Sequence, residues 1–121
     1  MTADESGKEM VAFAEQTASG LVRDNLRSTQ IRNIFTEVRQ IEAVWNQNPA
    51  RAMRRLQMLK PKMAYQAARQ RQVEKLRDVL VEAIDEVEKQ PAGEKRNQAF
   101  QRFTDLFEAI LAYHKAQGGK N

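Results

Sequence analysis

Apolar residues recur every three or four positions through most of the chain, which is the period of an amphipathic helix. Each apolar series stops close to a proline or a glycine, and the chain contains few of either. No segment alternates apolar and polar residues with the period of two that a half-buried strand requires. The sequence therefore predicts an all-α protein, a compact bundle of about five helices.

Capping residues place the ends of the first two predicted helices. A weak first helix is expected over residues 8–19, with Gly20 near its end and an apolar face of Met10, Phe13, Ala14 and Thr17. The second is expected to begin after Ser28 or Thr29, because a hydroxyl there can accept an orphan backbone N–H as the N-cap. Its apolar face runs through Ile31, Ile34, Phe35, Val38, Ile41 and Trp45.

Prolines and glycines delimit the other three helices. Asn48 and Pro49 suit an N-cap followed by the first helical position, so a third helix is expected over residues 49–70. A fourth should run from about residue 71 until Pro91 stops it, and a fifth from about residue 94 to the Gly118–Gly119 pair. Pro61 lies inside the third helix, so we expect a kink or a break near Leu59 and Lys60.

The length of 121 residues leaves room for one core, and 41% hydrophobic with 30% charged residues suits a bundle with a charged surface. We expect a single domain, with the bundle in residues 26–121 and the weak helix in residues 1–25. The absence of cysteine excludes disulfides and cysteine-based zinc sites. The start of the chain, residues 1–7, is polar and unlike a signal peptide, and the longest apolar run is too short to span a bilayer. A cytoplasmic protein without a membrane partner is expected.

Positive charge is concentrated in one quarter of the chain. Residues 51–75 contain eight basic side chains against one acidic side chain, Glu74, whereas the rest of the chain carries a small net negative charge. Arg55, Lys62 and Arg69 recur at intervals of seven and form a stripe with a spacing of about 10 Å on one helical surface. The stripe is widened by Arg51, Arg54 and Lys60. Because arginine suits forked contact with phosphate, the stripe predicts binding to a nucleic-acid backbone.

Tyr65 lies between Lys62 and Arg69 and has two equal interpretations. It could stack on a base or a ribose, or it could pack half-buried at the edge of the bundle. Trp45 is interpreted as a core residue or an interface anchor, and the phenylalanines of the last helix as core.

Catalytic and cofactor-binding patterns are not found. There is no Glu-x-x-His pair for a di-iron site and no glycine loop for phosphate, so no cofactor or metal is expected. The acidic residues Asp78, Glu82, Asp85 and Glu86 are interpreted as a solvated face of the fourth helix. The single histidine, His114, is interpreted as a helix-capping or packing residue. We therefore expect a protein that is not an enzyme.

Three stretches in order resemble a known family: LRSTQIRNIFTEVR (residues 26–39), LKPKMAYQAAR (residues 59–69) and FEAILAYHKAQGG (residues 107–119). Together they resemble the small helical subunit of type III-A CRISPR–Cas effector complexes, the Csm complexes. The resemblance implies a non-catalytic subunit present in several copies that stack head to tail. It implies as partners the guide RNA and the target RNA, the backbone subunits and the large signalling subunit. By position it matches Arg32, Lys60, Lys62, Tyr65, Arg69, His114 and Lys115 to the three motifs.

Among the candidate RNA-binding residues we favour Lys62 and Arg69, followed by Arg55 and Arg32. Three alternatives stay open. The chain could be a helical adaptor that binds only protein, a helix-turn-helix DNA reader with residues 64–75 as its recognition helix, or a small ribonuclease that uses His114 and Lys115.

Overall fold

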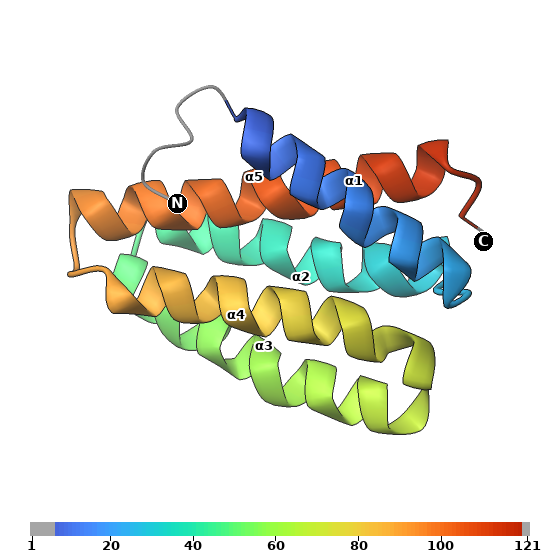
Figure 1. Ribbon diagram of the computed structural model, residues 1–121. Helices are drawn as coiled ribbons and strands as arrows, with labels where there is room; N and C mark the ends of the chain where they lie inside the picture. Colours follow the sequence, from blue (N-terminus) through green and yellow to red (C-terminus); the bar gives the residue numbers. More distant parts are fainter. Residues whose placement is uncertain (1–6, 120–121) are drawn as a thin grey trace.

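All regular structure in the computed structural model, which describes residues 7–119, is helical. The helices are α1 (Lys8–Arg23), α2 (Ser28–Trp45), α3 (Pro49–Arg69), α4 (Glu74–Lys89) and α5 (Glu94–Ala116), and a short 3₁₀ helix, η1 (Arg71–Val73), precedes α4 (Figure 1). The predicted all-α class and the prediction of about five helices are confirmed. Residues 1–6, which make up most of the polar stretch used in the signal-peptide argument, and residues 120 and 121 lie outside the described part.

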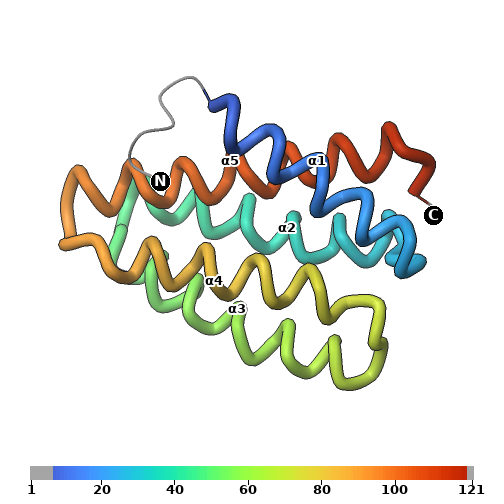
Figure 2. The backbone as a smooth tube through the Cα atoms, in the orientation of Figure 1, coloured from blue at the N-terminus to red at the C-terminus, as the bar shows by residue number. Residues whose placement is uncertain are grey.

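Helices α2 to α5 form a four-helix bundle, and α1 lies across one of its faces. In the bundle α2 packs on α3, α3 on α4, α4 on α5 and α5 back on α2, so the four helices close into a ring (Figure 2). The connections are short, and short connections make consecutive helices antiparallel neighbours. Helix α1 packs mainly on α5 and also touches α4. The single-domain division remains a prediction.

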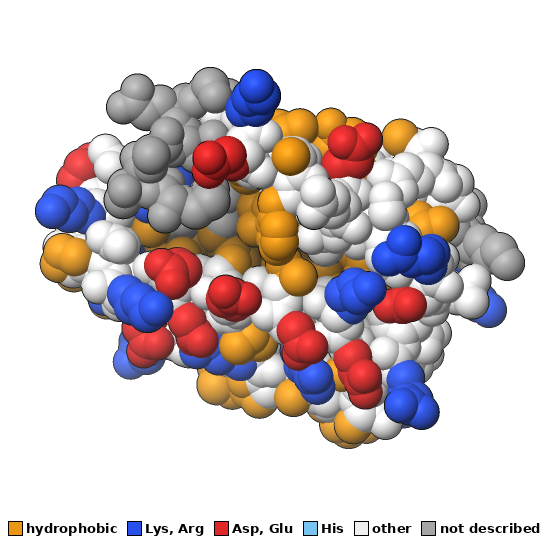
Figure 3. Space-filling view, in the orientation of Figure 1, with side chains coloured by type: hydrophobic (Ala, Val, Ile, Leu, Met, Phe, Trp, Pro, Cys, Tyr) orange, Lys and Arg blue, Asp and Glu red, His pale blue; other side chains and the backbone are white. Residues whose placement is uncertain are grey.

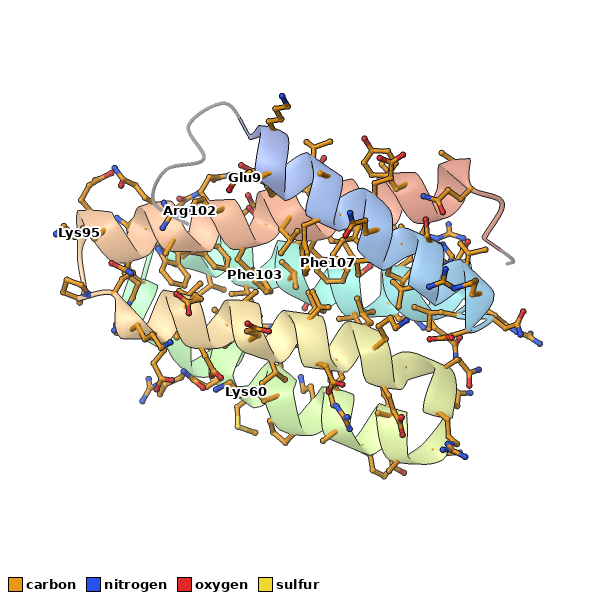
Figure 4. All side chains as sticks on the ribbon, viewed as in Figure 1. Glu9, Lys60, Lys95, Arg102, Phe103 and Phe107 are labelled. Carbon is orange, nitrogen blue, oxygen red and sulfur yellow. The ribbon has the colours of Figure 1, made fainter. Side chains whose placement is uncertain are left out.

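The core consists of the apolar series that the sequence indicates. The series of α2, α3 and α4 are buried, and Phe103 and Phe107 of α5 point into the bundle (Figure 4). Trp45 is also core, because its ring stacks on Phe100 at 4.1 Å between centroids and its Nε1–H donates to Asn97 Oδ1 at 2.8 Å. Of its two interpretations, the core one is confirmed within this chain.

Helix α1 differs from its prediction in length and in part of the face that it buries: Ala14 and Thr17 are buried as expected, but Phe13 is not. It continues to Arg23, so Gly20 lies inside the helix rather than at its end. The buried face is formed by Ala14, Thr17, Ala18, Gly20 and Leu21, whereas Phe13 is 47% exposed. Gly20 is buried because Lys75 of α4 crosses it, and a Cβ there would lie 2.6 Å from Lys75 Nζ. The small residues of α1 thus allow a close approach that the apolar pattern did not indicate.

The N-terminus of α2 is also different. Ser28 is the first helical residue, and the N-cap is Arg27, not Ser28 or Thr29. The Gln30 side chain accepts the Arg27 N–H at 2.9 Å. The Ser28 hydroxyl is buried and donates to the Gly119 carbonyl at 3.4 Å, so a long-range contact replaces the expected cap. At α3 the predicted cap is confirmed, since Asn48 Oδ1 accepts the Arg51 N–H at 3.1 Å.

Pro61 does not break α3, which is continuous from Pro49 to Arg69. Leu59 and Met63 on either side of it are both buried in the same core, while the proline is exposed. Of the expected kink or break, the break is wrong. The break comes instead at Gln70, whose backbone is extended (φ −137°, ψ 103°). This break falls inside residues 64–75, so the segment expected to be a recognition helix is not a single helix. The DNA-binding alternative therefore has no continuous helix to place in the major groove.

Candidate nucleic-acid interface

Arg55, Lys62 and Arg69 lie along one side of α3, as their spacing predicts. The first two members of this stripe, Arg55 and Lys62, face α2. Arg55 Nη2 is 2.9 Å from Glu37 Oε2 and 3.1 Å from Gln40 Oε1, and Lys62 Nζ is 3.7 Å from the same Glu37 oxygen. Glu37 is mostly buried, with 20% of its side chain exposed. The count of one acidic residue in residues 51–75 therefore overstates the free charge of the stripe, because α2 supplies a further carboxylate, Glu37.

Lys60 belongs to the other side of α3 and does not widen the stripe. It points toward α4 (Figure 4), where it forms ion pairs with Asp85 and, at 4.0 Å, with Glu88. Its side chain also helps to line a shallow hollow between α3 and α4. Lys60 is accordingly a poor candidate for RNA contact.

The C-terminal half of α3 forms a second hollow of about 480 Å³, lined by Lys62, Tyr65, Gln66, Arg69 and Gln70. Tyr65 is 64% exposed, so the interpretation as a half-buried edge residue is wrong. The guanidinium of Arg69 lies over the Tyr65 ring at 5.7 Å from the centroid, and Arg69 Nη1 donates to the Tyr65 hydroxyl at 3.3 Å. Arg69 forms no ion pair with any residue in the range 7–119. This hollow therefore presents a guanidinium without an ion-pair partner in the described residues, a loosely paired ammonium at Lys62, and an exposed tyrosine whose ring is in contact with Arg69.

The remaining candidates are dispersed. Arg51 and Arg54 are exposed in the first turns of α3, and Arg51 is about 27 Å from Arg69 along the helix axis. Arg32 is exposed on α2, turned away from Glu37 by the helical spacing, and Lys115 is exposed in the last turn of α5. None of the four has an ion-pair partner in the described part of the chain. The structure thus joins Lys62, Tyr65 and Arg69, places Arg55 beside them, and leaves these four apart.

His114 is fully buried, and its environment is structural. Its Nε2 lies 2.7 Å from the carbonyl oxygen of Leu26, in the turn between α1 and α2. Gly119 covers the ring so closely that a Cβ there would lie 2.1 Å from His114 Cε1. The packing interpretation is confirmed, although the site is deep rather than at an edge. The ribonuclease alternative loses its base, because no substrate can reach this ring.

The acidic residues of α4 are mostly held in ion pairs. Asp78 pairs with Arg77, Asp85 with Lys60, and Glu86 with Lys89 at 3.1 Å. The hydrogen bond with Glu86, and then the charges of Glu86, Asp85 and Glu82, raise the pKa of the Lys89 ammonium above its ordinary value. Figure 3 shows these acidic side chains gathered over α4 with basic ones among them. Within residues 7–119 no group of three His, Asp or Glu side chains is placed to hold a metal ion.

The family model for Csm2 Type III-A matches residues 4–120 of the chain. The chain belongs to the Csm2 Type III-A family. It is therefore a small subunit of a type III-A CRISPR complex, which confirms the resemblance of the three motifs. No curated protein and no solved structure matches the chain.

Membership of the Csm2 Type III-A family also bears on the expected partners and activity. It implies association with a type III-A Csm complex and places the chain in a structural small-subunit family. None of the helices in the described residues is long and apolar enough to cross a membrane. Sequence reasoning missed Glu37 as part of the interface, although Glu37 lies inside the first motif. Only the packing of α2 on α3 reveals that it faces the stripe.

Proposed function

We propose that this Csm2-family chain is the non-catalytic, RNA-binding small subunit of its complex. Several copies stack head to tail along the guide–target RNA duplex and hold its backbone through the outer face of α3. The observation that supports the proposal most directly is the hollow of Lys62, Tyr65 and Arg69. The backbone subunits and the large signalling subunit are the proposed protein partners.

The hollow offers what a phosphate backbone requires. Arg69 can donate two parallel N–H bonds to one phosphate, and Lys62 adds a point charge. The side-chain amides of Gln66 and Gln70 line the same space and can donate to phosphate or ribose oxygens. The exposed Tyr65 ring offers a stacking surface to a base or a ribose.

The ion pair of Lys62 does not prevent this role. Its nitrogen is 3.7 Å from Glu37, and 57% of its side chain is exposed. This contact is loose, and Glu37 keeps Arg55 as its partner at 2.9 Å when Lys62 moves away. A phosphate that also contacts Arg69 can therefore replace Glu37 as the partner of the Lys62 ammonium with little loss of free energy.

Contacts of this type fit a subunit that serves many guides. Bonds to phosphate position a ligand but read no sequence directly. One hollow offers few contacts, so a single copy should bind weakly. Stacked copies on one RNA would bind much more tightly, because the effective concentration of each further contact is high.

The double variant Lys62→Ala/Arg69→Ala tests the proposal, both in the isolated chain and in the assembled complex. We expect weaker binding to RNAs of unrelated sequence and a salt dependence flatter by about one unit for each lost phosphate contact. The matched control is Lys95→Ala/Arg102→Ala, which removes one lysine and one arginine from exposed positions of α5 (Figure 4). Wild-type RNA affinity and salt dependence in a normally assembled Lys62/Arg69 variant would disprove the proposal.

A second candidate, a protein-binding adaptor without RNA contact, is favoured by one observation. Met58, 57% exposed, and Tyr65 place apolar surface on the outside of α3. If the same double variant bound RNA normally while Met58→Ser lost copies from the complex, the adaptor function would be supported.

Catalytic inertness is tested separately. The isolated chain, incubated with single-stranded and double-stranded RNA with and without divalent metal, should leave both intact. Cleavage would contradict the proposal, and its loss in Lys115→Ala would identify a catalytic surface that the structure gives no reason to expect.

A further inference from the structure

Three arginines lie in the turns at the end of the bundle where α3 finishes and α2 begins. Arg27 is the N-cap of α2, Arg69 closes α3 and Arg71 opens η1. All three are exposed, and none forms an ion pair with another described residue. We call this group the arginine end. Lys and Arg side chains can be seen at this end in Figure 3.

A chain of hydrogen bonds holds the arginine end together across two helices. The Gln30 amide donates from Nε2 to Gln70 Oε1, and its own oxygen accepts the Arg27 N–H at 2.9 Å. Gln70 lies between Arg69 and Arg71 in the sequence. It also lines the hollow formed with Lys62, Tyr65, Gln66 and Arg69, which we call the α3 hollow. The bonded pair of glutamines therefore fixes Arg27 next to the turn that carries the other two arginines.

The position of Arg27 is electrostatically unfavourable in the free protein. The N-terminus of a helix carries a partial positive charge that favours anions, and N-caps are usually Ser, Thr, Asp or Asn. Here the N-cap is a cation, and the first turn of α2 contains no acidic residue. The first backbone N–H groups of a helix also lack partners within the helix. An anion at this end would be stabilised by both the helix and the arginines.

Carboxylates in the neighbouring turns do not neutralise the group. Asp24, in the turn before α2, is 3.7 Å from Lys75 and is thus engaged by another cation. Glu74 opens α4 next to Arg71, is exposed, and pairs with no cation in the described residues. In these turns, three arginines are therefore accompanied by one carboxylate, Glu74, that is not engaged by another cation in the described residues.

We propose that the arginine end is a second phosphate-binding surface, which continues the α3 hollow. The RNA backbone passes from Lys62 and Arg69 over Gln70 to Arg71 and Arg27. This inference rests on the proposed function, since it extends the same RNA path, and it adds two residues that sequence reasoning did not select. Guanidinium groups donate in a fork that matches phosphate oxygens, so the ligand is a nucleic-acid backbone rather than a base.

The test uses the double variant Arg27→Gln/Arg71→Gln, which removes both charges and keeps polar side chains. RNA affinity is measured against salt concentration for the isolated chain with an RNA duplex of arbitrary sequence, and for the assembled complex with its target. We expect about tenfold weaker binding and a salt dependence flatter by about two units. The control Lys95→Gln/Arg102→Gln removes two exposed charges from α5 (Figure 4) and should change neither value as much.

Folding is checked in the same variants. Arg27→Gln should not lower the melting temperature, because it removes a cation from the positive end of a helix. If it does, the single variant Arg71→Gln, which leaves the α2 N-cap unchanged, is used instead. It should flatten the salt dependence of RNA binding by about one unit.

The outcomes separate this inference from the proposed function. Weaker binding in Lys62→Ala/Arg69→Ala with wild-type binding in Arg27→Gln/Arg71→Gln would overturn the arginine end alone. Wild-type binding in both would overturn both. If the second variant lost copies from the complex while assembled complexes kept wild-type RNA affinity, the arginine end would be a protein contact, and the inference would be wrong.

Discussion

The middle of α3 and the arginine end carry similar numbers of basic side chains but differ in how those charges are used. In the middle, Arg55 and Lys62 share Glu37 of α2, and Lys60 is held by Asp85 of α4. At the arginine end, Arg27, Arg69 and Arg71 have no carboxylate partner among the described residues. Charge counted along the sequence is therefore not the charge that a ligand meets.

The difference follows from what surrounds each region. The middle of α3 packs between α2 and α4. Helix α2 supplies Glu37 to its basic side chains, and α4 supplies Asp85 and Glu88. The arginine end lies at the turns, where few residues are within reach. The basic middle is thus tied to the bundle, and the end is open to an outside partner.

The largest effect is expected from His114→Ala, which tests whether the α1–α2 turn, next to the arginine end, depends on the side chain packed beneath it. The ring is fully buried and bonds the Leu26 carbonyl, next to Arg27. Its removal leaves a cavity and an unpaired carbonyl, so the free energy of unfolding should fall by about 2–4 kcal/mol. Denaturant unfolding measures this.

The control for His114→Ala is Lys115→Ala, at the neighbouring exposed position, with an expected change within about 0.5 kcal/mol. Equal stability of the two variants would show that His114 does not hold the α1–α2 turn.

A smaller effect with the opposite sign is expected from Glu37→Gln, which turns the middle of α3 into a region like the arginine end. The amide keeps a hydrogen-bond acceptor but frees the charges of Arg55 and Lys62. RNA affinity at low salt should rise about threefold, and the salt dependence should steepen, because more phosphate charge can be neutralised. Binding titrations at several salt concentrations measure both.

Glu86→Gln is the matched control for this change, since among residues 7–119 Glu86 forms an ion pair with Lys89 alone, on α4 and away from the stripe. A loss of RNA affinity in Glu37→Gln would mean that Glu37 positions the two cations for RNA rather than competing with it.

The smallest effect is expected from Asp85→Asn, which removes the closer of the two α4 carboxylates that pair with Lys60. The pair is partly exposed, so the free energy of unfolding should fall by no more than about 1 kcal/mol. RNA binding should stay at the wild-type level, because Lys60 faces α4 and not the stripe. A gain in RNA affinity like that of Glu37→Gln would place the RNA path on both sides of α3.

Much of the fold was predictable from local signals. The apolar periods of α2 to α5 placed their buried faces, and Asn48–Pro49, Pro91 and Gly118 marked three of the ends, because caps and breakers act on their own backbone. The break predicted near Pro61 is absent for a tertiary reason, since burial of Leu59 and Met63 outweighs the local preference of one exposed proline. The exposure of Phe13 and the length of α1 likewise depend on how α1 packs against α5 and α4.

The candidate site divides in the same way. The sequence alone determined that Lys62, Tyr65 and Arg69 share one face of α3, because helical spacing fixes that relation within a single element. Only the tertiary structure decided that Glu37 meets the stripe, that Lys60 turns to Asp85, that His114 is buried under Gly119, and that Gln30 and Gln70 bring Arg27 to the end of α3. These relations join residues from different helices, and their distance in space is set by packing, which no local period along the chain encodes.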